Sequence, residues 1–331
     1  MTVLLIAIIA LALIFDFSNG FHDAANAIAT VVSTKVLRPV TAVIYGGILN
    51  FAGAMMGTEV AATIGKGLVD ASTITLTTVL FTVIGAIVWN LFTWWRGLPT
   101  SSSHAMIGSL LGATAFSQAG GFSHVTWHAV WGKVVVPMVT SPLLGLVFGL
   151  LFMTALTWLI YRLPLPRIHR LFGKLQIISA GFMAVSHGLN DAQKSMGIIA
   201  LALLLAHPGQ EFTVPLWVKA SCAIAMGLGT LSGGWRIIRT LGSKMIKLSP
   251  AQGFAAETTA AAIIAGASHF GIPVSTTHVI TSSIMGVGTT KRLSAVRWGV
   301  AGQIVWAWVL TLPLTFALSG AMMALYRMLA G

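Results

Sequence analysis

Long runs of apolar residues, interrupted by very few charges, restrict the fold of this chain more than any other feature of its sequence. Residues 3–34 form one such run, and residues 248–290 contain no Lys or Arg at all. A single crossing of a lipid bilayer needs about 20 apolar residues in helical form. Because 56% of the 331 residues are hydrophobic and only 8% are charged, the sequence predicts an all-α polytopic membrane protein.

The charged residues lie mostly between the apolar runs. The chain has 19 Lys and Arg against 7 Asp and Glu, an excess that can indicate nucleic-acid binding. Here, however, the basic residues fall in short connecting segments, which is typical of the cytoplasmic loops of membrane proteins. Lys35 and Arg38 follow the first apolar run, and residues 162–174 hold four more basic residues. The sequence therefore predicts that the middle of the chain is cytoplasmic, that both termini are outside, and that nucleic acid is not a partner.

Two apolar runs contain polar residues where a membrane helix is expected. Residues 16–26 include Asp16 and Asp23, and residues 186–194 include Asp191 and Lys194. We expect the helix to break at both places, with Asp16 as a local helix cap. An acidic residue at the centre of a membrane helix costs about 2.5–3.5 kcal/mol on insertion scales. Asp23 and Asp191 are therefore candidate functional residues.

A second pair of polar stretches combines a proline with several hydroxyls. Residues 99–104 are Pro-Thr-Ser-Ser-Ser-His, and residues 273–278 are Pro-Val-Ser-Thr-Thr-His. A proline followed by Ser or Thr is typical of a helix start, where backbone N–H groups lack partners within the helix. Such a start can bind an anion, although single hydroxyls in membrane helices also bond to their own backbone. We expect both stretches to form re-entrant hairpins.

The two halves of the chain repeat these features in the same order and at nearly the same offset. Gly20, Asp23 and Ala24 align with Gly188, Asp191 and Ala192, and Pro99, Ser101, His104, Ser109 and Gly112 align with Pro273, Ser275, His278, Ser283 and Gly286. This indicates an internal repeat, and repeats of membrane transporters hold the substrate between them, near the membrane midplane. The charge pattern favours inverted-topology repeats. We expect two membrane units, residues 1–161 and 175–331, joined by a basic cytoplasmic linker, residues 162–174.

These motifs resemble those of the inorganic phosphate transporter family called PiT. The resemblance rests on residues 20–30, residues 187–197 and both hydroxyl stretches, and it covers nearly the whole chain. It implies a secondary symporter for phosphate with inverted repeats, a homodimeric assembly, and coupling to Na⁺ or H⁺. Na⁺-coupled relatives tend to have Asn where this chain has Lys194, whereas bacterial proton-coupled relatives resemble it. The resemblance thus implies a multi-pass protein of a bacterial inner membrane, surrounded by lipid.

The resemblance also divides the polar residues of the motifs between substrate and coupling ion. The candidate ligands of the coupling ion or a metal are Asp23, Asn26, Asn190 and Asp191. The candidate phosphate-binding residues from the resemblance are Asn26, Ser101, Ser102, Ser103, Ser275, Thr276 and Thr277. Thr100 and Lys194 are added to this set for their own chemistry, as a hydroxyl donor and a positive charge.

The chemistry of these side chains agrees with that division. Phosphate leaves water only where donors replace its water contacts, and the hydroxyls and helix-start N–H groups supply donors while Lys194 neutralises charge. Asp23 and Asp191 repel an anion unless a cation or a proton is present, so phosphate binding depends on the coupling ion. A carboxylate also accepts a hydrogen bond from protonated phosphate, whereas sulfate carries no such proton at neutral pH. We expect no covalent cofactor, and phosphate either free or as a metal–phosphate complex.

Six further ionisable residues are assigned a supporting or gating role. The histidines either carry protons or hold the helix starts in place, with the structural role favoured. The glutamates either couple protons or pair with cations of the loops. These residues are His22, His104, His187, His278, Glu59 and Glu257.

Three other functions are compatible with parts of this pattern. A sulfate or other oxyanion permease would use the same scaffold, and an anion channel would use the same helix starts with less need of buried carboxylates. An intramembrane enzyme needs a nucleophile that faces a base, but the adjacent residues Ser103 and His104 do not face each other on one helix. No Gly-rich nucleotide loop supports direct use of ATP. We therefore expect a symporter that works by alternating access, and not an enzyme.

Overall fold

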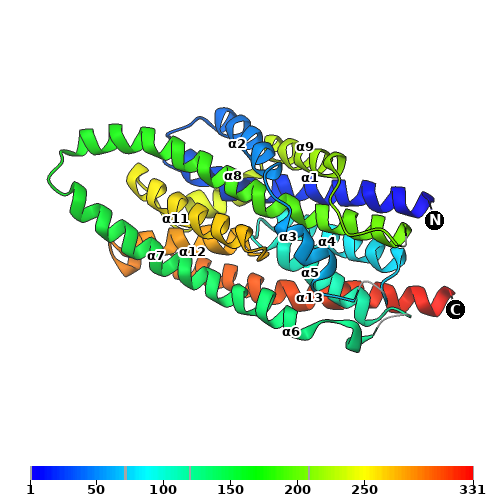
Figure 1. Ribbon diagram of the computed structural model, residues 1–331. Helices are drawn as coiled ribbons and strands as arrows, with labels where there is room; N and C mark the ends of the chain where they lie inside the picture. The colour runs from blue at the N-terminus through cyan, green and yellow to red at the C-terminus, as the bar shows by residue number, and fades with distance from the viewer. Residues whose placement is uncertain (1, 71–72, 119–120, 208, 331) are drawn as a thin grey trace.

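The computed structural model describes residues 2–70, 73–118, 121–207 and 209–330, and the regular structure of this part is helical. Both termini lie at one end of the elongated molecule, and the turn between the two halves, residues 161–164, lies at the other end (Figure 1). We call these the terminal end and the linker end. The helices are α1 Thr2–Ser33, α2 Pro39–Ala54, α3 Glu59–Lys66, α4 Leu76–Arg96, α5 Ser102–Ala115, α6 Trp127–Val130, α7 Val136–Ile160, α8 Leu165–Ala206, α9 Leu216–Ser232, α10 Trp235–Arg239, α11 Pro250–His269, α12 Thr276–Thr289 and α13 Trp298–Ala330.

Each half crosses the molecule an odd number of times. In the first half, α1, the bent pair α2–α3 and the stretch α6–α7 run from end to end, whereas α4 and α5 form a hairpin that turns back in the middle (Figure 1). In the second half, α8, the bent pair α9–α10 and α13 make the crossings, and α11 and α12 form the hairpin. Two related halves with an odd number of crossings must have opposite orientations in the membrane. The predicted inverted repeats with two re-entrant hairpins are therefore present.

The broken helices of the fold are not where the sequence analysis places them. Residues 16–26 lie inside α1 and residues 186–194 inside α8, and both helices are continuous. The breaks occur instead between α2 and α3, which bend by 68°, and between α9 and α10, which bend by 57°. Polar side chains inside a membrane helix leave its backbone hydrogen bonds intact when other helices supply side-chain partners. Asp16 therefore lies in the interior of a helix and is not a cap.

The two hydroxyl stretches form the tips of the hairpins, as predicted. Ser101 Oγ accepts a hydrogen bond from the backbone N–H of His104 at 3.1 Å, and Ser275 Oγ accepts one from His278 at 3.2 Å. Each serine thus caps the returning helix of its hairpin. The tips meet, because Ser103 Oγ donates to the Val274 carbonyl at 2.9 Å. The meeting point lies in the middle of the molecule.

Several helices pack against helices of the other half of the chain. The helix α1 packs against α9 of the second half and α8 against α2 of the first, and likewise α5 packs against α13 and α12 against α7. Aligned glycines permit these contacts. A Cβ atom on Gly188 would lie 2.1 Å from the Asn50 carbonyl oxygen, and one on Gly20 would lie 2.4 Å from that of Met226. Only glycine allows backbones to approach this closely.

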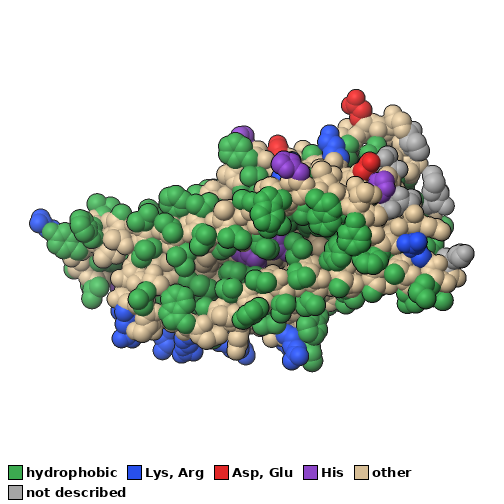
Figure 2. All heavy atoms as spheres, turned by 90° about the horizontal axis from the view of Figure 1, so that it is seen from below, with side chains coloured by type: hydrophobic (Ala, Val, Ile, Leu, Met, Phe, Trp, Pro, Cys, Tyr) green, Lys and Arg blue, Asp and Glu red, His purple; other side chains and the backbone are tan. Residues whose placement is uncertain are grey.

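The surface carries the charge pattern of a membrane protein with a cytoplasmic linker end. Four described helices are long and apolar enough to cross a membrane, and the two bent pairs bring the number to six. Figure 2 shows apolar side chains spread over one face, with Lys and Arg along the linker half and, on the terminal half, the visible acidic side chains together with further Lys and Arg. The linker-end loops 34–38, 161–164, 245–249 and 290–297 contain several Lys and Arg and no acidic residue. By the positive-inside rule, this charge pattern predicts a cytoplasmic linker end.

Candidate functional site

Two buried carboxylates from the longest helices lie at the centre of the candidate site. Asp23 projects from α1 and Asp191 from α8, and as whole residues they are 1% and 0% exposed. The two helices pack against each other, and the hairpin tips 99–104 and 273–278 lie against this pair. The structure thus brings together both acidic motifs and both hydroxyl stretches.

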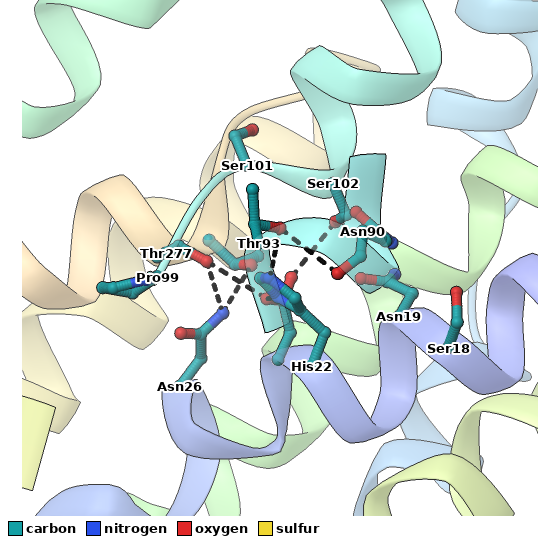
Figure 3. Close-up of polar contacts among 12 residues, drawn as sticks. Ser18, Asn19, His22, Asn26, Asn90, Thr93, Pro99, Ser101, Ser102 and Thr277 are labelled. Carbon is teal, nitrogen blue, oxygen red and sulfur yellow. Dashed lines mark hydrogen bonds and ion pairs between the residues drawn. The ribbon is translucent and has the colours of Figure 1, made fainter. Parts of the chain in front are cut away.

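Hydroxyls and a histidine surround Asp23. His22 Nδ1 lies 2.6 Å from Asp23 Oδ1, and Thr277 donates to the same oxygen at 3.4 Å. Ser102 Oγ donates to Asp23 Oδ2 at 3.1 Å. Each carboxylate oxygen of Asp23 therefore accepts a hydrogen bond from a different hairpin. In the close-up of Figure 3, Thr277 and Ser102 lie on the same side of α1, Thr277 to the left and Ser102 to the right.

Asp191 has an ammonium as its partner. Lys194 Nζ lies 2.8 Å from Asp191 Oδ1, and both side chains are inaccessible to solvent. The other oxygen, Oδ2, accepts from Thr276 at 3.3 Å and from Asn19 at 3.5 Å, and His187 Nε2 lies 3.3 Å away. A buried carboxylate needs this degree of compensation to remain charged.

Equivalent positions of the repeat make equivalent contacts. Ser102 bonds to Asp23 as Thr276 bonds to Asp191. Asn26 and Lys194 also occupy equivalent positions, and each reaches across to the hairpin of the other half. Asn26 Nδ2 donates to Thr276 at 3.2 Å and to Thr277 at 2.9 Å (Figure 3), while Lys194 Nζ donates to Ser102 at 3.1 Å. At this pair of equivalent positions, the contact with the opposite hairpin is therefore made by a neutral donor, Asn26, in the first half and by a cationic donor, Lys194, in the second.

The remaining predicted substrate residues are arranged less uniformly. Ser101 and Ser275 cap helices, and Figure 3 shows the Ser101 side chain directed away from the cluster. Ser103 bonds to the opposite tip, and the buried Thr100 hydroxyl has no hydrogen-bond partner among the residues that the structure describes. Asn190 donates to Ser268 at 2.8 Å. The hydroxyls of Ser102, Thr276 and Thr277 are thus the ones in direct contact with the carboxylates.

The four predicted supporting histidines form two different arrangements. His22 Nε2 lies 3.1 Å from the Thr93 hydroxyl and His187 Nδ1 lies 2.9 Å from Asn50 Oδ1, so outer partners orient the rings beside the carboxylates. His104 and His278 instead pack against each other where the tips meet, with ring centroids 4.9 Å apart. The His278 ring also stacks on Trp308 at 4.1 Å. This second pair is part of the contact between hairpins.

The two glutamates do not belong to the central cluster. Glu59 is exposed, at the start of α3, and accepts a hydrogen bond from the Thr58 backbone N–H at 2.9 Å. Glu257 is buried on α11 and accepts hydrogen bonds from Thr30, Ser179 and Gln176. Glu257 therefore connects α1, α8 and α11 on the linker side of the site.

The donor set could also hold a metal ion. One ligand atom each from Asp23, His187 and Asp191 lies within 4.8 Å of the others. Carboxylate and imidazole ligands suit a divalent transition metal or zinc. The arrangement is thus compatible with a cation between the two carboxylates.

Thr93 and Ser268 are site residues that the sequence analysis missed. Each lies near the end of the first helix of a hairpin and bonds to an equivalent position, Thr93 to His22 and Ser268 to Asn190. A hydroxyl a few residues before each hairpin proline, in both halves, is the signal that identifies them.

The model of the phosphate transporter family matches the chain twice, over residues 19–166 and over residues 163–319. A protein of Rhizobium meliloti (strain 1021), described as a probable low-affinity inorganic phosphate transporter, is 49% identical over 312 residues, which cover 94% of this chain and 92% of that protein. A protein of Bacillus subtilis (strain 168) with the same description is 44% identical over 319 residues, covering 96% and 95%.

A solved structure has the same fold over almost the entire length. It is titled "The sodium-dependent phosphate transporter", and it matches with a TM-score of 0.88 at 25% sequence identity, covering 99% of this chain and 100% of its own. The double family match and this structure confirm the predicted fold class, an all-helical membrane protein built from two repeats.

Proposed function

This chain belongs to the phosphate transporter family, and from that premise we propose that it is a secondary active symporter that carries inorganic phosphate across the membrane with a coupled cation. The family consists of transporters and not of enzymes. One observation carries the proposal: Asp23, Asp191 and Lys194 are buried together against hydroxyls of both hairpin tips.

The charges of this cluster make phosphate binding depend on a cation. Two carboxylates and one ammonium leave an excess of one negative charge when all three are ionised. Phosphate adds further negative charge in surroundings where unpaired charges are costly. Binding becomes favourable when a proton or cation enters with the anion, and the two then promote each other's binding. This mutual promotion is the thermodynamic basis of symport.

The position of Lys194 favours H⁺ over Na⁺ as the coupling ion. Its ammonium already occupies the place beside Asp191 that a bound cation would take, at 2.8 Å. The equivalent residue of the first half is the neutral Asn26, which donates to hydroxyls only. A proton needs no coordination shell of its own, whereas Na⁺ does. Similarity to the sodium-dependent transporter keeps Na⁺ as the second candidate.

The proposed mechanism is alternating access at the contact between the hairpins. Asp23, Asp191, Lys194, Ser102 and Thr277 are 1% exposed or less, so this conformation is closed to both sides. Each hairpin enters from a different end of the molecule. Movement of one tip away from α1 and α8 opens the site to that end only, and the inverted repeat makes the opposite movement equivalent.

Uptake of labelled phosphate into proteoliposomes tests this function. A pH gradient and a Na⁺ gradient are imposed separately on wild type, Asp23→Asn and Asp191→Asn, with Ser18→Ala as the matched control because Ser18 bonds only to its own helix at Phe15. We expect concentrative uptake driven by the pH gradient, lost in both Asp variants and retained in the control. Uptake driven by neither gradient would indicate a channel, and equal inhibition by sulfate would indicate a general oxyanion permease.

A metal–phosphate complex is a second candidate substrate. It is favoured by the cluster of Asp23, His187 and Asp191, whose ligand atoms lie within 4.8 Å of one another. Uptake is measured with and without a chelator of divalent cations, together with uptake of the metal itself. Chelator-resistant phosphate uptake with no metal uptake would exclude this substrate. We also propose a homodimer, which cross-linking in membranes tests.

A further inference from the structure

A row of buried polar side chains extends along one face of α1 beyond the candidate site. Its members follow each other at spacings of three and four residues, which places them on one face of a helix. They are Asp16, Asn19, Asp23, Asn26 and Thr30, and none is more than 1% exposed. Four of the five have been described above in contact with Asp191, the hairpin hydroxyls or Glu257. Asp16 is the member on the terminal side, and the proposed function assigns it no task.

The surroundings of Asp16 differ from those of Asp23 and Asp191, the two carboxylates of the candidate site. Its side chain is 0% exposed, and within the described part of the chain neither carboxylate oxygen has a hydrogen-bond partner at normal geometry. The polar groups that lie close to it are the Ser195 hydroxyl of α8 and the Cys222 thiol of α9. The Ser195 hydroxyl also lacks a hydrogen-bond partner. An ionised carboxylate without a close counter-ion is costly inside a membrane.

A charge on Asp16 would also be felt by the charged groups of the candidate site. Among the described residues, the titratable groups that influence it are Cys222 on α9 and Lys194 and Asp191 on α8. When Asp16 is ionised, Lys194 has two carboxylates to attract its ammonium. When Asp16 is protonated, Lys194 is shared only between Asp191 and Ser102. A proton on Asp16 therefore removes one negative charge from the neighbourhood of the Lys194 ammonium and of the anion site.

We propose that Asp16 is the proton-binding site of the transport cycle, loaded from the terminal end of the molecule and coupled to phosphate through Lys194. This inference rests on the proposed symport and names the group that carries the proton. The carboxylate takes one proton from water when the site opens to the terminal end, and returns that proton to water when the site opens to the linker end. Protonation of Asp16 strengthens phosphate binding, and phosphate binding strengthens protonation of Asp16, which links the proton flux to the phosphate flux. The repeat supplies no second such group, because Ala184 occupies the equivalent position of α8.

The variant Asp16→Asn tests this assignment, since an amide imitates the protonated carboxyl and cannot release a proton. Two assays in proteoliposomes are compared: uptake driven by a pH gradient, and exchange of labelled for unlabelled phosphate with no gradient. We expect Asp16→Asn to lose about 100-fold in driven uptake while it keeps exchange, because only the return of the empty, deprotonated carrier is blocked. Asp16→Glu restores driven uptake in part. Exchange in the variant also demonstrates that it is folded.

The outcomes separate this inference from the proposed function. If wild type responds to the pH gradient and Asp16→Asn responds equally, Asp16 is not the proton site and the symport proposal stands. If wild type responds only to Na⁺, proton coupling itself is wrong, and Asp16 has no such role.

A second variant serves if Asp16→Asn does not fold. Cys222→Ser places a stronger hydrogen-bond donor beside the carboxylate and favours its ionised form. The pH of half-maximal uptake then moves to lower values by about one unit. An unchanged pH profile in a folded Cys222→Ser protein contradicts the proposal.

Discussion

Lys194 occupies the position of the second half that is equivalent to Asn26 of the first half, and the contacts of the two side chains differ. Equivalent residues of a repeat are expected to make equivalent contacts, and Asn26 and Lys194 each donate to the opposite hairpin. Only Lys194 also neutralises a carboxylate, at 2.8 Å. An inverted repeat gives each half the same shape but leaves its charges free to differ. The charge of the site is therefore unequal between the two halves, and the ammonium on the side of Lys194 favours binding of an anion.

Removal of the Lys194 ammonium tests the energetic part of this interpretation. Lys194→Asn leaves Asp191 charged, buried and without a cation, and breaking such a pair costs about 3–5 kcal/mol. We expect a lower thermal unfolding temperature in detergent and the loss of phosphate uptake. The double variant Lys194→Asn with Asp191→Asn removes both charges, so it recovers the unfolding temperature but not transport. Equal stability of the single and double variants would contradict the assigned ion pair.

Among the helices, the hairpins were predictable and the long polar helices were not. The start of α5 depends on Pro99 and the Ser101 cap, which are local signals, and the same is true of α12 with Pro273 and Ser275. The polar residues of α1 and α8 also signal a break locally. They remain helical because residues from the other half, such as Thr276 for Asn26 and Asn50 for His187, satisfy their side chains. Such partners lie more than a hundred residues away, so no local pattern reveals them.

The same limit applies to the candidate site. The sequence identified Asp23, Asp191, Lys194 and the hydroxyls as candidates, because acids, bases and Ser clusters are unusual in apolar runs. It could not separate Ser101, which caps a helix, from Ser102, which contacts Asp23. That difference follows from one position along the first helical turn.

Close packing between helices of the two halves depends on aligned glycines and can be tested at α8. A Cβ atom at Gly188 would lie 2.1 Å from the Asn50 carbonyl oxygen, whereas one at Gly173 of the same helix would meet nothing within 4 Å. We expect Gly188→Ala to force α2 and α8 apart, at a cost of about 1–3 kcal/mol, and to lower both the unfolding temperature and uptake. Gly173→Ala is the matched control and should behave as wild type in size-exclusion and thermal-shift measurements. Similar behaviour of the two variants would mean that this helix contact adapts.

The orientation of the whole molecule follows from the distribution of charge between its ends. The linker-end loops contain several basic and no acidic residues, whereas Asp70 and Glu211 lie in loops at the terminal end. The inverted repeat requires the termini to share one side and the linker to lie on the other, as Figure 1 shows. Together with the positive-inside rule, this predicts external termini and a cytoplasmic linker.

Cysteine labelling in right-side-out membrane vesicles tests that orientation with little background, because Cys222 is the one cysteine of the sequence and is 0% exposed. Glu211 at the terminal end and Arg167 at the linker end are both exposed. A membrane-impermeant maleimide should label Glu211→Cys in intact vesicles, and Arg167→Cys only after the vesicles are opened. The parent protein should stay unlabelled in both conditions. The reverse pattern would invert the molecule in the membrane, and Asp16 would then lie on the cytoplasmic side of the site, where an inward proton gradient could not load it.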